Sequence, residues 1–205
     1  MWQWINENSD ALSVLVSLVT MFVWIAYFHI LYAGFKRQRR THILINRGAG
    51  HTTQSRCLIS NMGAEPLYII SIIGVLEGDG DPVTAPITDL DESEAGEAHN
   101  PRETTSQGPM MSGDYMDVGS FADLMARSAR MAGEPDTDVE TRFEAFRIIV
   151  VAAYGAEDLS VGAERRFVLR GDGPDREVEV ESVSTTQLRS RRARRRLERI
   201  LRDFR

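Results

Sequence analysis

Six acidic residues crowd one stretch of the chain, and clustered carboxylates can bind calcium. They are Asp79, Asp81, Asp89, Asp91, Glu92 and Glu94. Calcium takes about six to eight oxygen ligands, and the loop that most often supplies them ends in a glutamate at a fixed spacing. That spacing is absent, so we expect a solvated acidic loop. In an enzyme with a site built from scattered loops, Asp79, Asp81 and His99 would be the least implausible contributors.

Histidine and cysteine side chains carry much metal and nucleophilic chemistry, but here they stand apart. The histidines are His29, His42, His51 and His99. No H-E-x-x-H or C-x-x-C motif, serine elbow or phosphate-binding loop is present, and the glycines of RGAGH at 47–51 favour a tight turn. Cys57 is the single cysteine, and its place in an expected strand favours a buried thiol. These patterns predict a protein that is not an enzyme and that has no metal or cofactor.

The densest positive charge lies in the C-terminal segment SRRARRRLERILRDFR. At about 100° per residue, its apolar side chains fall on one side of a helix and arginines occupy much of the rest. The residues expected to contact a membrane or a partner are Arg191, Arg192, Arg194, Arg195, Arg196, Leu197, Arg199, Ile200, Leu201 and Phe204. The pattern predicts a basic amphipathic helix over 188–205.

Anionic lipid, a partner helix and nucleic acid compete for this helix. Lipid is favoured, because each arginine near an anionic surface contributes about 1 kcal/mol and the chain carries an apolar anchor. The expectation is that Leu197, Ile200, Leu201 and Phe204 reach the acyl boundary while the arginines lie among headgroups. Nucleic acid is less favoured, since no folded recognition module accompanies the arginines. A solvated helix without a specific partner stays open.

The element that positions everything else is an apolar stretch, Ala11 to Phe35, without a formally charged side chain. A helix needs roughly 20 apolar residues to cross the hydrocarbon of a bilayer, so this stretch is long enough. Acids precede it, and the basic residues that follow it are Lys36, Arg37, Arg39 and Arg40. Because positive flanks face the cytoplasm, we expect a single-pass anchor in the cell inner (plasma) membrane. Residues 1–10 would then lie outside, and 36–40 would stop transfer.

Residues 41–185 show the alternation of β-strands. Ile148, Val150 and Ala152 share one face of an expected central strand, and Phe167 and Leu169 point inward with the arginines around them outward. About six or seven strands joined by Gly-rich turns favour an all-β antiparallel sandwich in the cytoplasm. The segment ISNMGAEPLYII resembles the strand, Asn-x-Gly turn, proline and strand of immunoglobulin-like domains. An ordinary hairpin of another β fold is the alternative.

An acidic, partly disordered insertion at 78–140 interrupts this pattern. It has few large apolar residues and repeated Pro and Gly, so we expect mobility between about Val83 and Ser112. Residues 120–132 predict a short helix, because Ser120 and Asp123 have N-terminal capping spacing and the apolar residues share a face. Arg127 and Arg130 should point away from that face. Such a helix most often covers the end of a sandwich, and a helix that docks a partner is the alternative.

The organisation predicts a membrane-anchored accessory or scaffold protein without catalysis. Its partners would be the lipid bilayer and another membrane or cytoplasmic protein, and a homo-oligomer is open. The alternative is a membrane-tethered regulator that binds anionic lipid or nucleic acid through its arginine-rich tail. An enzyme with a site built from loops is the third hypothesis.

Overall fold

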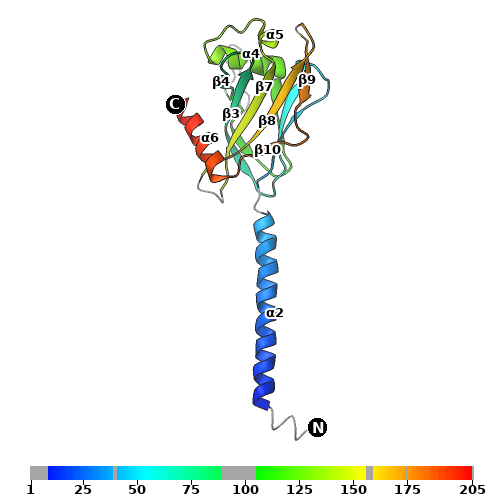
Figure 1. The fold of residues 1–205 in the computed structure, drawn as a ribbon, viewed down its shortest axis with the longest axis vertical. Helices are drawn as coiled ribbons and strands as arrows, with labels where there is room; N and C mark the ends of the chain where they lie inside the picture. The colour runs from blue at the N-terminus through cyan, green and yellow to red at the C-terminus, as the bar shows by residue number, and fades with distance from the viewer. Residues whose placement is uncertain (1–8, 39–40, 89–104, 156–158, 174, 205) are drawn as a thin grey trace. The chain divides into compact units, whose positions relative to one another are not determined.

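The computed structural model describes residues 9–38, 41–88, 105–155, 159–173 and 175–204. The chain divides into two compact units, Met1–Arg40 and Thr41–Arg205. The first contains one long helix, and the second is a mostly antiparallel β domain with a few helices (Figure 1).

The long helix is α2 (Ser9–Gln38), and no residue of its apolar window, Ser9–Gly34, is buried. The Ser17 and Thr20 hydroxyls donate to carbonyls four residues earlier, each at 2.8 Å, so these polar groups are satisfied within the helix. The helix is long and apolar enough to cross a membrane, as the sequence predicts. The crossing itself stays a prediction.

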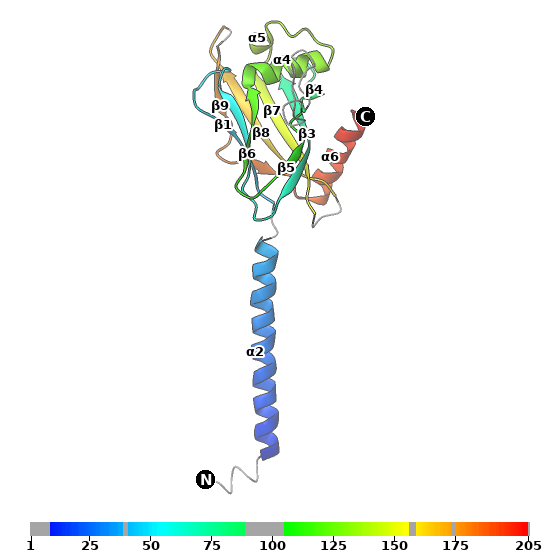
Figure 2. The same ribbon diagram turned by 180° about the vertical axis from the view of Figure 1, so that it is seen from behind.

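In the described part of the second unit, ten strands form two sheets (Figures 1 and 2). The strands are β1 (Ile43–Arg47), β2 (Arg56–Asn61), β3 (Leu67–Glu77), β4 (Val83–Pro86), β5 (Gly108–Met110), β6 (Tyr115–Ser120), β7 (Ala145–Ala153), β8 (Val161–Arg170), β9 (Glu177–Val180) and β10 (Thr186–Gln187). The small sheet has the order β1-β2-β6. The large sheet has the order β10-β8-β7-β3-β4, with β5 also paired to β3 and β9 to β8.

The core lies between the inner faces of these sheets. Ile45 of β1 and Ile59 of β2 are fully buried with Ile72 of β3. Phe167 of β8 meets Phe121 edge-on, with ring centroids 4.7 Å apart. The alternation of apolar and polar residues that predicted these strands therefore places one face of each sheet in a shared core.

The described residues of the domain also form three helices, which are α4 (Phe121–Met131), α5 (Val139–Arg142) and α6 (Arg191–Asp203). The capping predicted for α4 is confirmed, since the Asp123 amide donates to Ser120 Oγ at 3.1 Å. Gly74 of β3 lets α4 approach, because a Cβ there would overlap Ser128 Oγ and the Phe146 ring. The prediction that Arg127 points outward is wrong. Arg127 is 2% exposed and donates to the Ile87 carbonyl at 3.3 Å.

Part of the expected insertion is ordered sheet. The described flanks of the expected mobile stretch contain β4 and β5, both paired with β3, and β6 joins the small sheet. Residues 89–104, with Asp89, Asp91, Glu92, Glu94 and His99, lie outside the described residues. The strands β4 and β5 contain few large apolar residues. They are ordered because they pair with the long, buried strand β3.

Candidate interaction surface on the C-terminal helix

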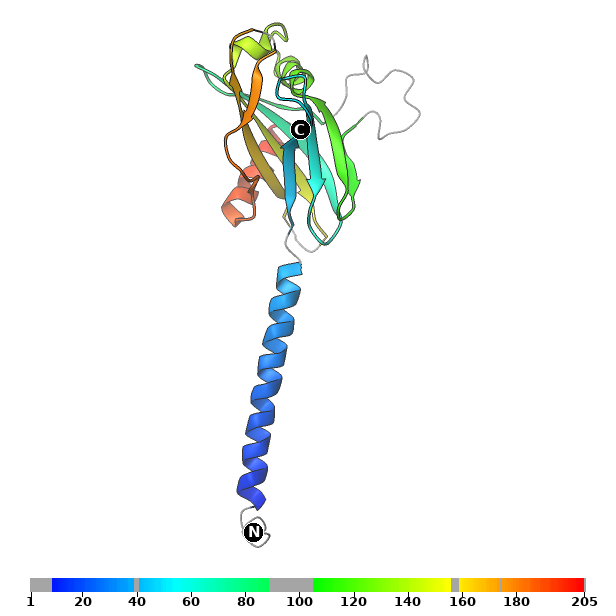
Figure 3. The same ribbon diagram turned by 90° about the vertical axis from the view of Figure 1, so that its right-hand side faces the viewer.

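The predicted C-terminal helix is present as α6, and it packs on the outer face of the large sheet. Leu197 is 1% exposed and forms a second apolar cluster with Ile73, Val75, Ile149 and Val151. Leu188, Ile200 and Leu201 are partly buried against the same cluster. Figure 3 shows α6 away from the strands of the small sheet. The stripe expected at the acyl boundary thus has the sheet as its apolar partner.

Gly162 of β8 makes this close packing possible. A Cβ at this position would lie 2.7 Å from Leu197 Cδ1 and 2.7 Å from the Val150 carbonyl oxygen. Neither distance is tolerated, so a side chain here would push Leu197 away from the sheet. The absence of a side chain on β8 is therefore a requirement for docking α6.

The start of α6 is held next to the first residues of the β domain. Ser190 caps the helix, with its Oγ accepting from the Ala193 amide at 3.1 Å. Just before it, Arg189 donates to the Thr41 carbonyl. The Gln187 amide group pairs with the Ile43 backbone, donating at 2.6 Å and accepting at 3.1 Å.

The opposite side of α6 is an arginine ridge, which we define as the exposed arginines of this helix. They are Arg191, Arg192, Arg195, Arg196, Arg199 and Arg202. Arg194 is half-buried, and Phe204 is 39% exposed. Within the helix, Arg202 lies 3.7 Å from Glu198. Because the apolar stripe faces the sheet, the ridge presents guanidinium groups to the surroundings.

A groove runs along one flank of α6. It consists of two adjoining pockets of about 770 Å³ and 730 Å³ that share Ile149, Arg196, Arg199 and Ile200. The sheet contributes Glu164 to the first pocket and Glu77 with Arg147 to the second. Glu164 Oε2 is buried and accepts no hydrogen bond from the residues that the structure describes. The groove combines an apolar floor with charges of both signs.

Apart from Glu164, the charged groups on the sheet side of this groove pair with one another. Glu77 pairs with Arg147 and, at 2.6 Å, with Arg166, which also reaches Glu181 at 2.6 Å. The hydrogen bond that Arg166 donates to Glu77 raises the pKa of the Arg166 guanidinium. The positive character of this side of the domain therefore comes from α6.

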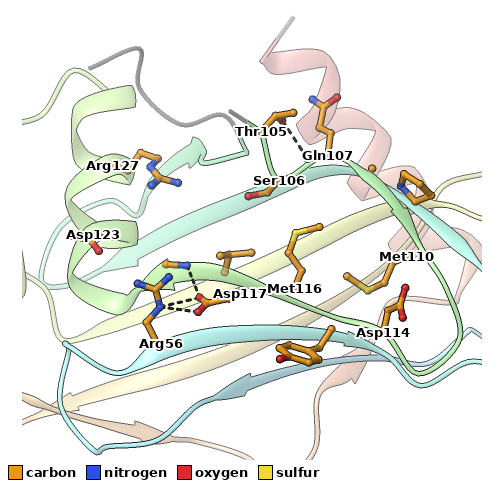
Figure 4. Close-up of a pocket in the computed structure, with 15 residues that line it drawn as sticks. Arg56, Thr105, Ser106, Gln107, Met110, Asp114, Met116, Asp117, Asp123 and Arg127 are labelled. Carbon is orange, nitrogen blue, oxygen red and sulfur yellow. Dashed lines mark hydrogen bonds and ion pairs between the residues drawn. The ribbon is translucent and has the colours of Figure 1, made fainter. Parts of the chain in front are cut away.

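A second pocket, of about 510 Å³, lies between α4, β5 and β6 (Figure 4). Its charged groups already have structural partners. Arg56 binds Asp117 at 2.8 Å, and this hydrogen bond raises the pKa of the guanidinium. Asp123 accepts from Ser120 Oγ at 2.5 Å, and Asp114 accepts from the Met111 amide at 3.0 Å. This arrangement stabilises the turn and the helix start.

The cysteine and histidine candidates are dispersed in the part of the chain that the structure describes. Cys57 is fully buried, and that burial raises the pKa of its thiol far above the ordinary value. His51 Nδ1 lies 3.0 Å from Arg47 Nη2, beside Gly50, whose φ of 95° confirms the tight turn. Among the described residues, no group of three or more His, Cys, Asp or Glu side chains is arranged so that it could hold a metal ion.

The remaining acidic and basic candidates also lie apart. Asp79 and Asp81 are exposed on the turn between β3 and β4. Lys36 and Arg37 fall in the last turn of α2, whereas Arg39 and Arg40 lie outside the described residues. The role in membrane topology predicted for these four basic residues stays a prediction.

Arg165 was expected outside the sheet and instead points into the core, where it is 5% exposed. It donates to the Ile45 carbonyl at 2.7 Å and to the Ser182 and Val183 carbonyls at 3.0 and 3.1 Å. Burial lowers the pKa of its guanidinium. These bonds join β8 to β1 and to the loop before β10, so its role is structural.

No family model, curated protein or solved structure matches this chain. Its function must be argued from its own parts. These are an exposed apolar helix, a β domain whose buried arginines join its strands, and a C-terminal helix with an outward arginine ridge.

Proposed function

We propose that this protein is a single-pass membrane-anchored accessory or scaffold protein. In this proposal the β domain is an immunoglobulin-like sandwich in the cytoplasm that binds another membrane or cytoplasmic protein. The single observation that carries the proposal is α2, whose apolar window has no buried residue. A contiguous apolar surface of that length is far larger than water-soluble monomers expose, so it needs an apolar environment.

The sequence beside α2 supports the orientation. Lys36, Arg37, Arg39 and Arg40 follow the apolar stretch, and acids precede it. Positive residues flank the cytoplasmic end of a span, so the β domain lies on that side. A single buried Cys57 is compatible with a reducing compartment.

The groove beside α6 supports the binding of a protein. Ile149 and Ile200 supply an apolar floor, while Arg196, Arg199 and Glu164 supply both signs of charge around it. A polypeptide offers apolar side chains together with carboxylates and ammonium groups, which matches that lining better than a purely anionic polymer does. We expect the partner to insert a short amphipathic segment here.

Partner capture with matched variants tests this function. The full chain is purified in mild detergent after chemical cross-linking, and the co-purifying proteins are identified by mass spectrometry. Arg196→Glu/Arg199→Glu should lose a partner that the native chain retains. Arg130→Glu/Arg170→Glu, which changes the charge equally at exposed sites away from the groove, should keep it. Equal recovery with both variants would refute the groove as the binding surface.

A further inference from the structure

We infer that the first turns of the arginine ridge, Arg191, Arg192 and Arg195, bind the headgroups of anionic lipids in the membrane that α2 spans. The inference rests on the proposed anchoring by α2. It adds a lipid-binding site of defined residues, with a binding mode that uses headgroup phosphates and leaves the acyl layer untouched.

The first step is the position of the α6 start within the β domain. Arg189 donates to the Thr41 carbonyl, and Gln187 pairs with the Ile43 backbone. These bonds fix the first turn of α6 beside the residues at which the chain enters the domain. Arg191 follows only two residues after Arg189.

The second step is the length of chain between Thr41 and the apolar helix. Two residues, Arg39 and Arg40, lie between Thr41 and Gln38, the last residue of α2, and the three residue steps span at most about 11 Å. The apolar window ends at Gly34, so the last turn of α2 rises about 6 Å beyond it. That rise is comparable to the thickness of one headgroup layer. When α2 spans the membrane, Thr41 therefore lies close to the lipid–water boundary.

The third step is the availability of the guanidinium groups. Arg191, Arg192 and Arg195 are exposed, and none forms an ion pair with another described residue. A guanidinium matches phosphate geometry with two parallel hydrogen bonds. The anionic headgroups of a membrane within about one Debye length are therefore the strongest partner that these guanidinium groups can reach.

The docking of α6 determines how the lipid is bound. Leu197 fills the space over Gly162 and is 1% exposed, so it has no free surface for the acyl chains. This arrangement replaces the expectation that Leu197, Ile200 and Leu201 enter the acyl boundary. Binding by the ridge is then electrostatic, and it strengthens by about fivefold with each arginine near the surface.

Arginine footprinting of the full chain in nanodiscs tests the site. Phenylglyoxal modifies accessible guanidinium groups, and mass spectrometry reads the rate at each arginine. Discs of phosphatidylcholine are compared with discs containing phosphatidylglycerol. We expect Arg191, Arg192 and Arg195 to react about fivefold more slowly in the anionic discs. Arg199 and Arg202, farther along α6, should change less, and about 1 M NaCl should abolish the protection.

Variants of equal charge separate a site from general attraction. In Arg191→Gln/Arg195→Gln, the protection of Arg192 should disappear. In Arg199→Gln/Arg202→Gln, the protection of the first turns should persist. Equal rates in the two kinds of disc, or uniform protection along α6, would overturn the inference. The same protection by inorganic phosphate with neutral discs would overturn it too, since the arginines would then bind a free anion.

The anchoring by α2 is measured separately in the same preparation, as co-elution of the chain with the discs. A chain that does not co-elute with the discs contradicts the proposed anchor. A chain that co-elutes but shows no protection contradicts only the lipid site.

Discussion

Gly162 is a residue whose missing side chain decides where the C-terminal helix lies. A methyl group there would lie 2.7 Å from both Leu197 Cδ1 and the Val150 carbonyl oxygen. We expect Gly162→Ala to lower the free energy of unfolding by about 1–3 kcal/mol, as overpacking does. Urea unfolding followed by circular dichroism measures it. Gly80→Ala is the control, because nothing lies within 4 Å of its Cβ position. Equal stability of both variants would contradict the packing described for α6.

Arg165 joins β8 to β1 from inside the core. Replacing it by methionine leaves the Ile45, Ser182 and Val183 carbonyls without this donor. We expect Arg165→Met to cost about 2–3 kcal/mol of unfolding free energy. Arg170→Met, an exposed arginine on the same strand, should change it by about 0.5 kcal/mol or less. A loss no larger than that of the control would show that these hydrogen bonds contribute no net stability.

The Cys57 thiol links stability to alkaline pH. Burial raises its pKa above the ordinary value of 9.0, so the folded state keeps the proton after the unfolded state has released it. Below about pH 9, the buried neutral thiol makes its full contribution to the free energy of unfolding. Above that point, this contribution falls by about 1.4 kcal/mol per pH unit. Unfolding measured at pH 8 and pH 10 should show this slope in the native chain and a smaller one in Cys57→Ala. Identical slopes would exclude the thiol as the cause.

The inward direction of Arg165 was present in the sequence pattern. Arg165, Phe167 and Leu169 are two residues apart, so strict alternation places their side chains on the same face of the strand. Phe167 and Leu169 were correctly predicted to point inward, but the charge of Arg165 led to the prediction that it points outward. The buried position of Arg127 could not be read in this way, because its partner, the Ile87 carbonyl, is distant in the sequence.

At the scale of elements, α6 covers an apolar patch on the outer face of the large sheet. Ending the chain at Arg189 would uncover Ile73, Val75, Ile149 and Val151. We expect that truncated chain to bind the dye ANS and to aggregate more readily. An unchanged dye signal after truncation would mean that another segment covers the patch.

Leu197→Ala in the full chain should cost about 2–5 kcal/mol of unfolding free energy, because the side chain is buried.

The long elements were predictable, and the short ones were not. Helix α2 and strand β3 are nearly continuous apolar runs, whereas β7, β8, α4 and α6 have periodic apolar patterns, and the sequence displays both kinds of signal directly. β4 and β5 pair with the longer strand β3, and β6 pairs with β2 from a distant part of the sequence. Their own composition therefore indicated an insertion. The packing of α6 on the sheet depends on Gly162, and its amphipathic pattern alone fits a sheet or a lipid equally well.

At the scale of the whole molecule, the predicted topology places the C-terminus in the cytoplasm. Basic residues follow the apolar stretch and acids precede it, so we expect the flank after Phe35 to stay inside. A reporter that is active only outside the cytoplasm, fused after Arg205, should be silent, while a cytoplasmic reporter should be active. Replacing Lys36, Arg37, Arg39 and Arg40 by glutamine should raise the first signal. Strong activity of the outer reporter on the native chain would contradict the topology.

The hydrogen bonds between Gln187 and Ile43 join residues 144 positions apart. During synthesis, β1 is the first of the described strands to be made, but its Thr185 and Gln187 partners follow 140 or more residues later. The β domain therefore cannot close until the ribosome has passed Gln187. Throughout that interval, an anchored nascent chain would hold the free edge of β1 at the membrane surface, where a chaperone or a second nascent copy could reach it.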